Sequence, residues 1–204
     1  PWLRQFGTEE VAHKKYLNSW FTGKWPGSPS RGELYNDDPR LGDARLCGTT
    51  ASLCGLESAK TPEETELALA CDLMLHAWML TQSGIPVLYS GDEVGQRNDN
   101  SYHDDSDKAA DSRYLHRGNF DWEKAELRKD TDTYQGRLFA ALRKLETIRG
   151  AEPVFRSDAK MTAFDTGSIH VIGIRRDLGD EHFIGLFNFS RKNVLLLLSE
   201  QSGV

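Results

Sequence analysis

The stretch TPEETELALACDLMLHAWMLTQSGIPVLYSG, residues 61–91, determines the fold that the sequence predicts. Thr61 and Glu64 have the spacing of a capping box, which satisfies the free amide groups at the start of a helix. Apolar residues then recur at the spacing of one helical face: Leu67, Ala70, Leu73, Met74, Ala77, Trp78 and Leu80. Gly84 favours the left-handed conformation that ends a helix. We therefore predict a helix over residues 62–83.

A short apolar run, IPVLYS at residues 85–90, follows this helix and is closed by Gly91. Such a run between turn residues is typical of a buried parallel strand. Helix, tight turn and parallel strand form the repeat of an α/β fold. A second helix is predicted over residues 133–149, with Gly150 as its end.

The N-terminal 60 residues show little regular patterning beyond a short predicted helix over residues 11–21. A loop rich in Gly and Pro follows at residues 23–32 and contains Trp25. A long loop with aromatic and basic residues is usually functional or disordered, and Trp25 favours a function.

The pattern changes after Pro153, where short alternating or apolar runs are separated by turn residues. The runs cover residues 160–164, 170–175, 182–188 and 194–198. They predict antiparallel strands of a second, all-β domain.

Composition excludes several classes of protein. The 204 residues contain 25 Lys and Arg against 31 Asp and Glu, so a basic nucleic-acid-binding protein is not expected. The longest apolar runs, among them residues 194–198, are far shorter than the ~20 residues that cross a bilayer. Three cysteines at no metal-ligand spacing, and no recognisable signal peptide, indicate a reduced cytoplasmic protein.

Two acidic residues, Asp92 and Glu93, follow the predicted strand at its carboxyl end, where α/β folds bind ligands. Alternatively, these carboxylates cap the loop or pair with an arginine. Adjacent strand residues point to opposite faces, so the two are not expected to act as one catalytic pair.

The segment over residues 92–121 is rich in Asp and suggests calcium. An EF-hand loop needs Gly at its sixth position and Glu at its twelfth. With the loop registered on Asp99, those positions hold Asp104 and Ala110, so the match fails. We predict no metal site and no cofactor.

Arg113 lies two residues after Asp111, which can orient the guanidinium group toward sugar hydroxyls or another carboxylate. The alternative is a weak surface ion pair. No phosphate-binding glycine loop, zinc-protease motif or nucleophile elbow occurs in the chain.

Three segments together resemble glycoside hydrolase family 13, and among its members amylosucrases and sucrose hydrolases are the most similar. They are GIPVLYSGDEVG (residues 84–95), DSRYLHR (residues 111–117) and GDARLCGTTA (residues 42–51). The resemblance implies the C-terminal part of a (β/α)8 TIM barrel followed by the start of an antiparallel β-sandwich. Residues 1–152 would supply loop 7, helix 7, strand 8, loop 8 and helix 8, and residues 153–204 the partial sandwich.

The resemblance also implies a function: part of a retaining α-glucosyl transferase or hydrolase that acts on sucrose and α-glucans. It places Arg113, oriented by Asp111, at the bottom of a glucose pocket and Arg45 on the acceptor side. Lys14 replaces the arginine of a His-Arg pair of the family. It further implies a supporting role for three residues of the same region: Asp92, Glu93 and His116.

The catalytic carboxylates of the family precede the part of the enzyme that this chain resembles. The chain is therefore expected to lack catalytic residues, to be inactive alone and to need the N-terminal remainder of a parent enzyme. Two alternatives stay open: a fragment of an α-amylase or α-glucosidase, and a non-catalytic module that binds glucan or protein.

Overall fold

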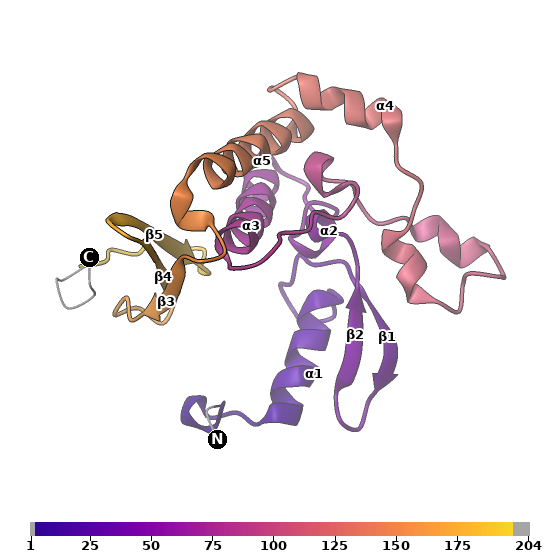
Figure 1. Ribbon diagram of the computed structural model, residues 1–204. Coiled ribbons are helices and arrows are strands. Elements are labelled where there is room, and N and C mark those ends of the chain that lie inside the picture. Colours follow the sequence, from indigo (N-terminus) through magenta and orange to yellow (C-terminus); the bar gives the residue numbers. More distant parts are fainter. Residues whose placement is uncertain (1–2, 198–204) are drawn as a thin grey trace. The chain divides into compact units, whose positions relative to one another are not determined.

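The computed structural model describes residues 3–197 and combines helices with two small antiparallel sheets (Figure 1). Its α-helices are α1 (Glu10–Phe21), α2 (Thr50–Leu53), α3 (Pro62–Thr81), α4 (Trp122–Ala125) and α5 (Tyr134–Ala151). Its strands are β1 (Glu33–Asp38), β2 (Asp43–Cys47), β3 (Lys160–Phe164), β4 (Val171–Leu178) and β5 (Glu181–Asn188). Short 3-10 helices are η1 (Leu3–Phe6), η2 (Asp92–Val94), η3 (Asn100–Asp104), η4 (Ser112–His116), η5 (Glu126–Lys129) and η6 (Pro153–Phe155).

The chain divides into two compact units. The first contains the residues up to Asp72 together with Leu88–Ala140, and the second contains Leu73–Val87 together with the residues from Ala141 onward. The division therefore falls inside both long helices, α3 and α5.

The predicted helix over residues 62–83 is confirmed as α3, which ends at Thr81. Its capping box is formed: Thr61 Oγ1 accepts from the backbone N–H of Glu64 at 3.2 Å, and the Glu64 carboxylate accepts from the N–H of Thr61 at 3.3 Å. Gly84 follows with φ +100°, the left-handed conformation predicted for it.

The face of α3 that is buried differs from the predicted one. Leu80 of the predicted face is buried, but Leu67 is 42% exposed, and the other buried residues of the helix are Ala68, Leu69, Asp72, His76 and Thr81. Apolar residues surround this helix, so their spacing alone did not select a face. In the first unit, Ala68 packs with Ala51 and Leu56, and Tyr134 completes this core.

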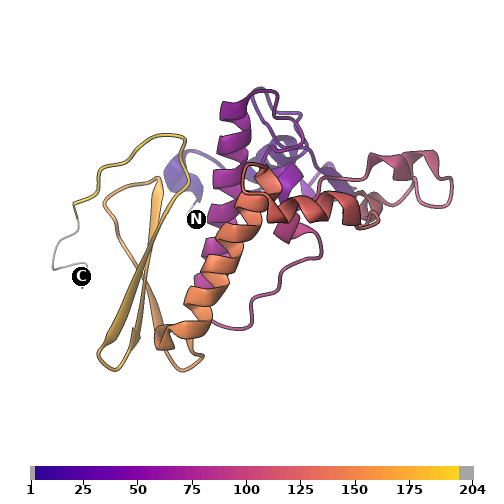
Figure 2. The same cartoon turned by 90° about the horizontal axis from the view of Figure 1, so that it is seen from above.

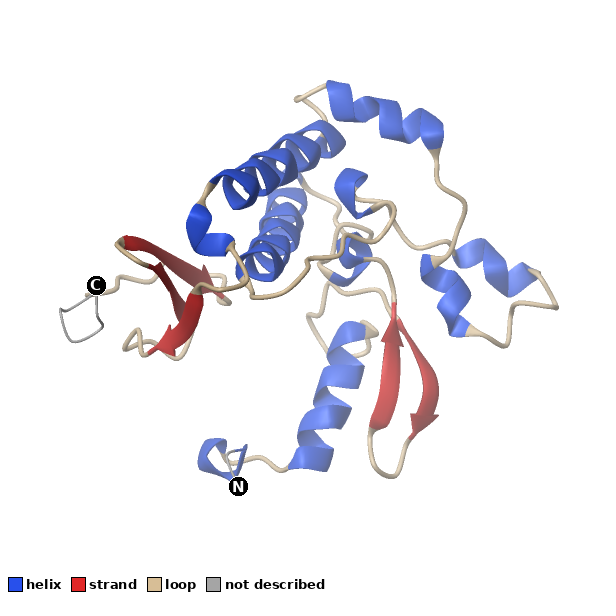
Figure 3. Ribbon diagram, in the orientation of Figure 1, coloured by secondary structure: helices blue, strands red, loops and turns tan. Residues whose placement is uncertain are grey.

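The predicted parallel strand over residues 85–90 is wrong. The segment between α3 and η2 is a loop (Figure 3), with Ile85 91% exposed and Val87 75% exposed. A strand requires hydrogen bonds to a neighbouring strand, and none of the strands in residues 3–197 pairs with this segment.

The predicted helices 11–21 and 133–149 are confirmed as α1 and α5. Gly150 was expected to end the second helix but lies in its last turn, because α5 continues to Ala151. Leu138 and Leu142 are the fully buried residues of α5, whereas Ile148 of the predicted apolar face is 38% exposed.

A β-hairpin formed by β1 and β2 was not predicted. Its two strands pair antiparallel in the register Glu33 to Cys47, Leu34 to Leu46 and Tyr35 to Arg45. The register shifts between Tyr35 and Asp38, where Asn36 adopts φ +50°. Asn and Asp disfavour strands, which explains why the sequence ELYNDD did not indicate one.

Three of the four strands predicted after Pro153 are confirmed in the second unit. They form one antiparallel sheet in the order β3-β4-β5, in the part of the chain that follows α5 (Figure 2). Of the fourth predicted strand, residues 194–197 have no regular structure and Leu198 lies outside the described residues.

Residues 3–197 show neither a fragment of a TIM barrel nor a β-sandwich, because both of their sheets are small and antiparallel (Figure 3). The barrel and the sandwich therefore stay predictions about a parent protein. Within the same residues, every helix is too short or too polar to cross a membrane.

Candidate functional site

The candidate site is built on one face of the β1–β2 hairpin. Residues two apart on a strand share a face, and directly opposed residues of an antiparallel pair lie side by side. Glu33 and Tyr35 of β1 therefore share a face with their partners Cys47 and Arg45 of β2. This set of four residues, the hairpin face, carries one acidic, one aromatic and one basic side chain around a buried thiol.

The short helix η4 is docked against this hairpin. Asp111 caps η4, because its carboxylate accepts a hydrogen bond from the backbone N–H of Arg113 at 3.0 Å. Ser112 donates its hydroxyl hydrogen to the carbonyl of Leu34 at 2.9 Å. The DSRYLHR segment and the hairpin are therefore joined although they are far apart in sequence.

Arg113 is held rigidly above the hairpin face. Its Nε donates to the two Asp111 oxygens at 2.8 and 3.0 Å, and its Nη2 donates to Oδ2 at 2.6 Å. The guanidinium carbon lies 4.5 Å from the centre of the Tyr35 ring. Within residues 3–197 the third nitrogen, Nη1, has no hydrogen-bond acceptor, and the side chain is 39% exposed.

These contacts determine the charge state of the pair. The hydrogen bonds from Arg113 lower the pKa of Asp111 to about 2, although partial burial of the carboxylate opposes the change. The same hydrogen bonds raise the pKa of Arg113 above its usual range. Both side chains are therefore charged at neutral pH.

Three of the four predicted substrate-binding residues come together here. Arg45 is exposed and opposes Tyr35 in the hairpin, while Arg113 lies over that same ring. Asp111 completes the group through Arg113.

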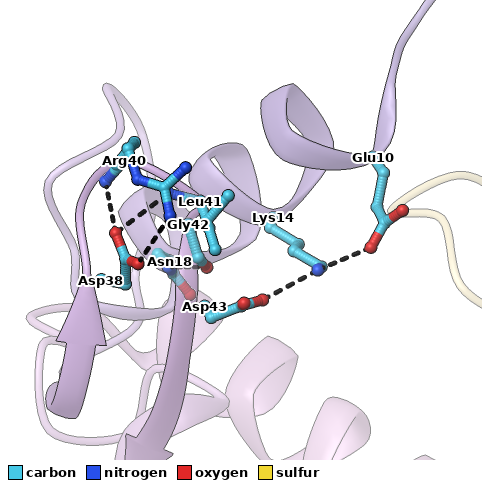
Figure 4. A network of polar contacts seen from close by, with 8 residues as sticks. All are labelled: Glu10, Lys14, Asn18, Asp38, Arg40, Leu41, Gly42 and Asp43. Atoms are coloured by element: carbon cyan, nitrogen blue, oxygen red, sulfur yellow. Dashed lines mark hydrogen bonds and ion pairs between the residues drawn. The ribbon is translucent and has the colours of Figure 1, made fainter.

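Lys14 lies apart from this face, in a polar network between α1 and the turn of the hairpin (Figure 4). Its ammonium group contacts Asp43 at 2.8 Å and Glu10 at 2.6 Å. Hydrogen bonding, first to Asp43 and then to Glu10, raises the pKa of Lys14 above its usual range. The structure thus gives Lys14 two carboxylate partners and a role in fixing α1 to the hairpin turn.

Asp92 and Glu93 bind the backbone of their own turn. Asp92 accepts from the N–H of Tyr89 at 3.3 Å, and Glu93 accepts from the N–H of Gly91 at 2.9 Å. These contacts agree with the loop-capping alternative of the sequence analysis.

His116 ends η4 and faces the start of α2. Its Nδ1 accepts a hydrogen bond from the N–H of Gly48 at 3.4 Å, and its ring meets the edge of Tyr89 at 5.8 Å. Burial, aided by the nearby positive charge of Arg117, lowers the pKa of His116. A neutral imidazole that orients backbone is therefore expected at neutral pH.

Sequence reasoning missed the residues that complete the hairpin face. Glu33 is bonded to Tyr102 and His103 of η3, which follow it by about 70 positions. Burial, and then the hydrogen bond to Glu33, raises the pKa of Tyr102 to about 12. The sequence signal for this strand is the alternation of side-chain polarity over Glu33, Leu34 and Tyr35, which is too short to predict a strand.

The arrangement offers several groups that can bind a polar ligand. It presents fixed donors, a carboxylate and an aromatic ring, and the residues described here hold no group of three or more metal-binding side chains. No protein-family model matches the chain.

Proposed function

We propose that this chain forms the sugar-binding wall of a retaining α-glucosyl transferase or hydrolase that acts on sucrose and α-glucans. The observation that carries the proposal is the geometry of Arg113, which Asp111 fixes above Tyr35 with Nη1 open to a ligand. The resemblance of residues 42–51, 84–95 and 111–117 to glycoside hydrolase family 13 supplies the reaction class.

The geometry supports saccharide binding on physical grounds. A guanidinium group that is already immobilised loses little further entropy when it binds a ligand. Its Nη1 N–H groups can donate to hydroxyl oxygens, and the part of the Tyr35 ring that Arg113 leaves uncovered can pack against the C–H groups of a sugar. Arg45, which opposes Tyr35 in the hairpin, adds a second donor.

The parent enzyme in this proposal is amylosucrase-like and has a TIM barrel followed by a β-sandwich. Its two reacting carboxylates, which retaining enzymes hold about 5–5.5 Å apart, belong to the N-terminal remainder. The proposal includes no cofactor. It places the protein in the cytoplasm, which the three free cysteines of the described residues favour.

Two other functions remain candidates. An α-amylase or α-glucosidase would use the same wall and would differ in preferring starch or maltose to sucrose. A non-catalytic module that binds glucan or protein is favoured by Trp25, which is 44% exposed and packs edge-on against Tyr16 at 4.9 Å.

The test is a calorimetric titration of the 204-residue chain with sucrose and with maltotriose. We expect saturable binding, and about tenfold weaker binding after Arg113→Ala, because one charge-assisted hydrogen bond is lost. Arg40→Ala is the matched control, since Arg40 is an exposed arginine of the same hairpin whose guanidinium group lies 3.8 Å from the Asp38 carboxylate.

Glucose release by the same preparations is measured in parallel. We expect none from either sugar, because the reacting carboxylates lie outside this chain. Absence of binding by the wild-type chain, or equal binding by the Arg113→Ala variant, would contradict the proposed wall. Turnover of sucrose would contradict its non-catalytic role.

A further inference from the structure

Glu33, at the start of β1, is held from two sides by consecutive residues of η3. The Tyr102 hydroxyl donates to Oε2, and His103 Nε2 lies 2.8 Å from Oε1. The two rings of η3 are stacked, with 4.1 Å between their centres and 31° between their planes. Tyr102 is 4% exposed, so the carboxylate rests on a buried support.

The carboxylate nevertheless remains open to a ligand. The Glu33 side chain is 30% exposed and that of His103 is 48% exposed. In residues 3–197 each carboxylate oxygen is paired once, and such an oxygen can accept a second hydrogen bond. Glu33 also lacks a Lys or Arg partner within that range, so its negative charge is oriented without being neutralised by a permanent cation.

Its position adds a second group to the proposed sugar-binding wall. Glu33 precedes Tyr35 by two residues on the same face, a separation of about 7 Å along a strand. Arg113 lies over Tyr35 and presents a donor, whereas Glu33 presents an acceptor. A sugar hydroxyl is both donor and acceptor, so a saccharide across Tyr35 can satisfy both groups at once.

We infer that Glu33 is a saccharide-binding residue, oriented by Tyr102 and His103, which accepts a hydrogen bond from a hydroxyl of the sugar whose other end Arg113 binds. This inference rests on the proposed function and extends it. It assigns to the hairpin face a requirement for a free hydroxyl on the ligand, because a carboxylate accepts hydrogen bonds and cannot donate them.

The experiment compares wild-type chain, Glu33→Gln and Arg113→Ala in titrations with sucrose and with maltotriose. Asp37→Asn is the matched control, since Asp37 is an exposed carboxylate of the same strand. We expect about tenfold weaker binding for Glu33→Gln and a change within about twofold for Asp37→Asn. Backbone amide shifts of residues 33–38 and 43–47 should move on titration with the wild-type chain.

The outcomes separate this inference from the proposed function. If Arg113→Ala weakens binding and Glu33→Gln does not, the wall stands and the role of Glu33 is wrong. If the wild-type chain binds neither sugar, both are wrong. Circular dichroism shows whether each variant is folded. If Glu33→Gln is not folded, Glu33→Asp replaces it, since aspartate keeps the charge but has a shorter side chain. The same weakening of binding is expected for Glu33→Asp.

Tyr102 acts as a positioning residue in this inference. Tyr102→Phe keeps the ring stack but removes the hydrogen bond to Glu33, and about threefold weaker binding is expected. In the Glu33→Gln background the same change should cause no further loss, because Tyr102 acts through the carboxylate. Equal losses in both backgrounds would show that Tyr102 only supports the fold.

Discussion

Each of the two units contains an arginine close to an aromatic ring. In the first unit the hairpin supplies the ring and η4 the arginine, and in the second the three-stranded sheet supplies the arginine; the two arginines differ in exposure and in partners. Arg113 of η4 lies 4.5 Å from the ring centre of Tyr35 and is partly exposed, and its Nη1 has no acceptor among residues 3–197. Arg176 of β4 lies 5.7 Å from the ring centre of Phe155 and is 0% exposed. The same side chain is available for binding in one region and entirely structural in the other.

The partners of the two arginines explain this difference. Arg176 donates to the carbonyls of Val154 at 2.7 Å, Thr81 at 3.1 Å and Arg156 at 3.0 Å, and to the Ser83 hydroxyl at 3.2 Å. Carbonyls that end a helix carry partial negative charge, so they accept a cation without a carboxylate. Arginine near a ring therefore indicates a binding site only when its donors are not all used inside the protein.

The largest effect is expected from Arg176→Met, which should lower the free energy of unfolding of the second unit by about 3 kcal/mol. The change leaves buried carbonyls without donors, whose desolvation is then uncompensated. The measurement is urea denaturation followed by circular dichroism.

The neighbouring Arg175→Met is the control. Arg175 is half-buried and pairs with Asp177 at 2.7 Å, so a loss below about 1 kcal/mol is expected. Equal losses for the two variants would show that the carbonyl contacts of Arg176 are not what stabilises this sheet.

A second prediction concerns the pKa of Asp111, which should rise from about 2 toward its ordinary value of 3.8 in Arg113→Met. A pKa lowered by folding means that the ionised carboxylate stabilises the native state above about pH 4, and that this contribution is lost as the pH falls toward 2. Carboxyl carbon shifts in an NMR titration measure the midpoint.

Arg40→Met should leave the Asp111 midpoint unchanged, since Arg40 contacts Asp38 instead. Saccharide binding by the wild-type chain should weaken over the same range of pH. If the Asp111 carboxyl of the wild-type chain titrates near pH 3.8, Asp111 does not hold Arg113 in place.

A third, smaller effect is expected on the Tyr102 phenol in Glu33→Gln. Its pKa should fall from about 12 but stay above the ordinary 10, because burial is the larger cause and persists in the variant. Since folding raises this pKa, the neutral phenol stabilises the native state fully below pH 10, and the contribution is lost as the pH rises toward 12. NMR of labelled tyrosine rings measures the change, and an unaltered midpoint would argue against the Glu33 contact.

The smallest effect sharpens the comparison of the two arginines directly. Arg113→Met should lower the free energy of unfolding far less than Arg176→Met does, because the Asp111 pair is partly exposed to water. The same urea denaturation applies. A loss as large as that of Arg176→Met would place Arg113 among the structural residues.

The extent to which the sequence predicted this molecule varies with the range of the interactions. Local signals succeeded: the Thr61 and Glu64 capping box, the left-handed Gly84 and the strands β3 to β5 are all present. The Asp111 and Arg113 pair could also be predicted, since two polar residues only two positions apart can form an ion pair without help from the rest of the fold. The run at residues 85–90 failed because a strand depends on a partner that no local pattern supplies.

The sequence by itself determined where helices start, where the chain turns and which two residues form the central ion pair, because these depend on neighbours within a few positions. Only the tertiary structure decided that η4 docks on the hairpin, that Arg113 lies over the ring of Tyr35, and that Glu33 meets Tyr102. Residues 69 or more positions apart meet only when the backbone between them is folded, and side-chain chemistry alone does not specify that path.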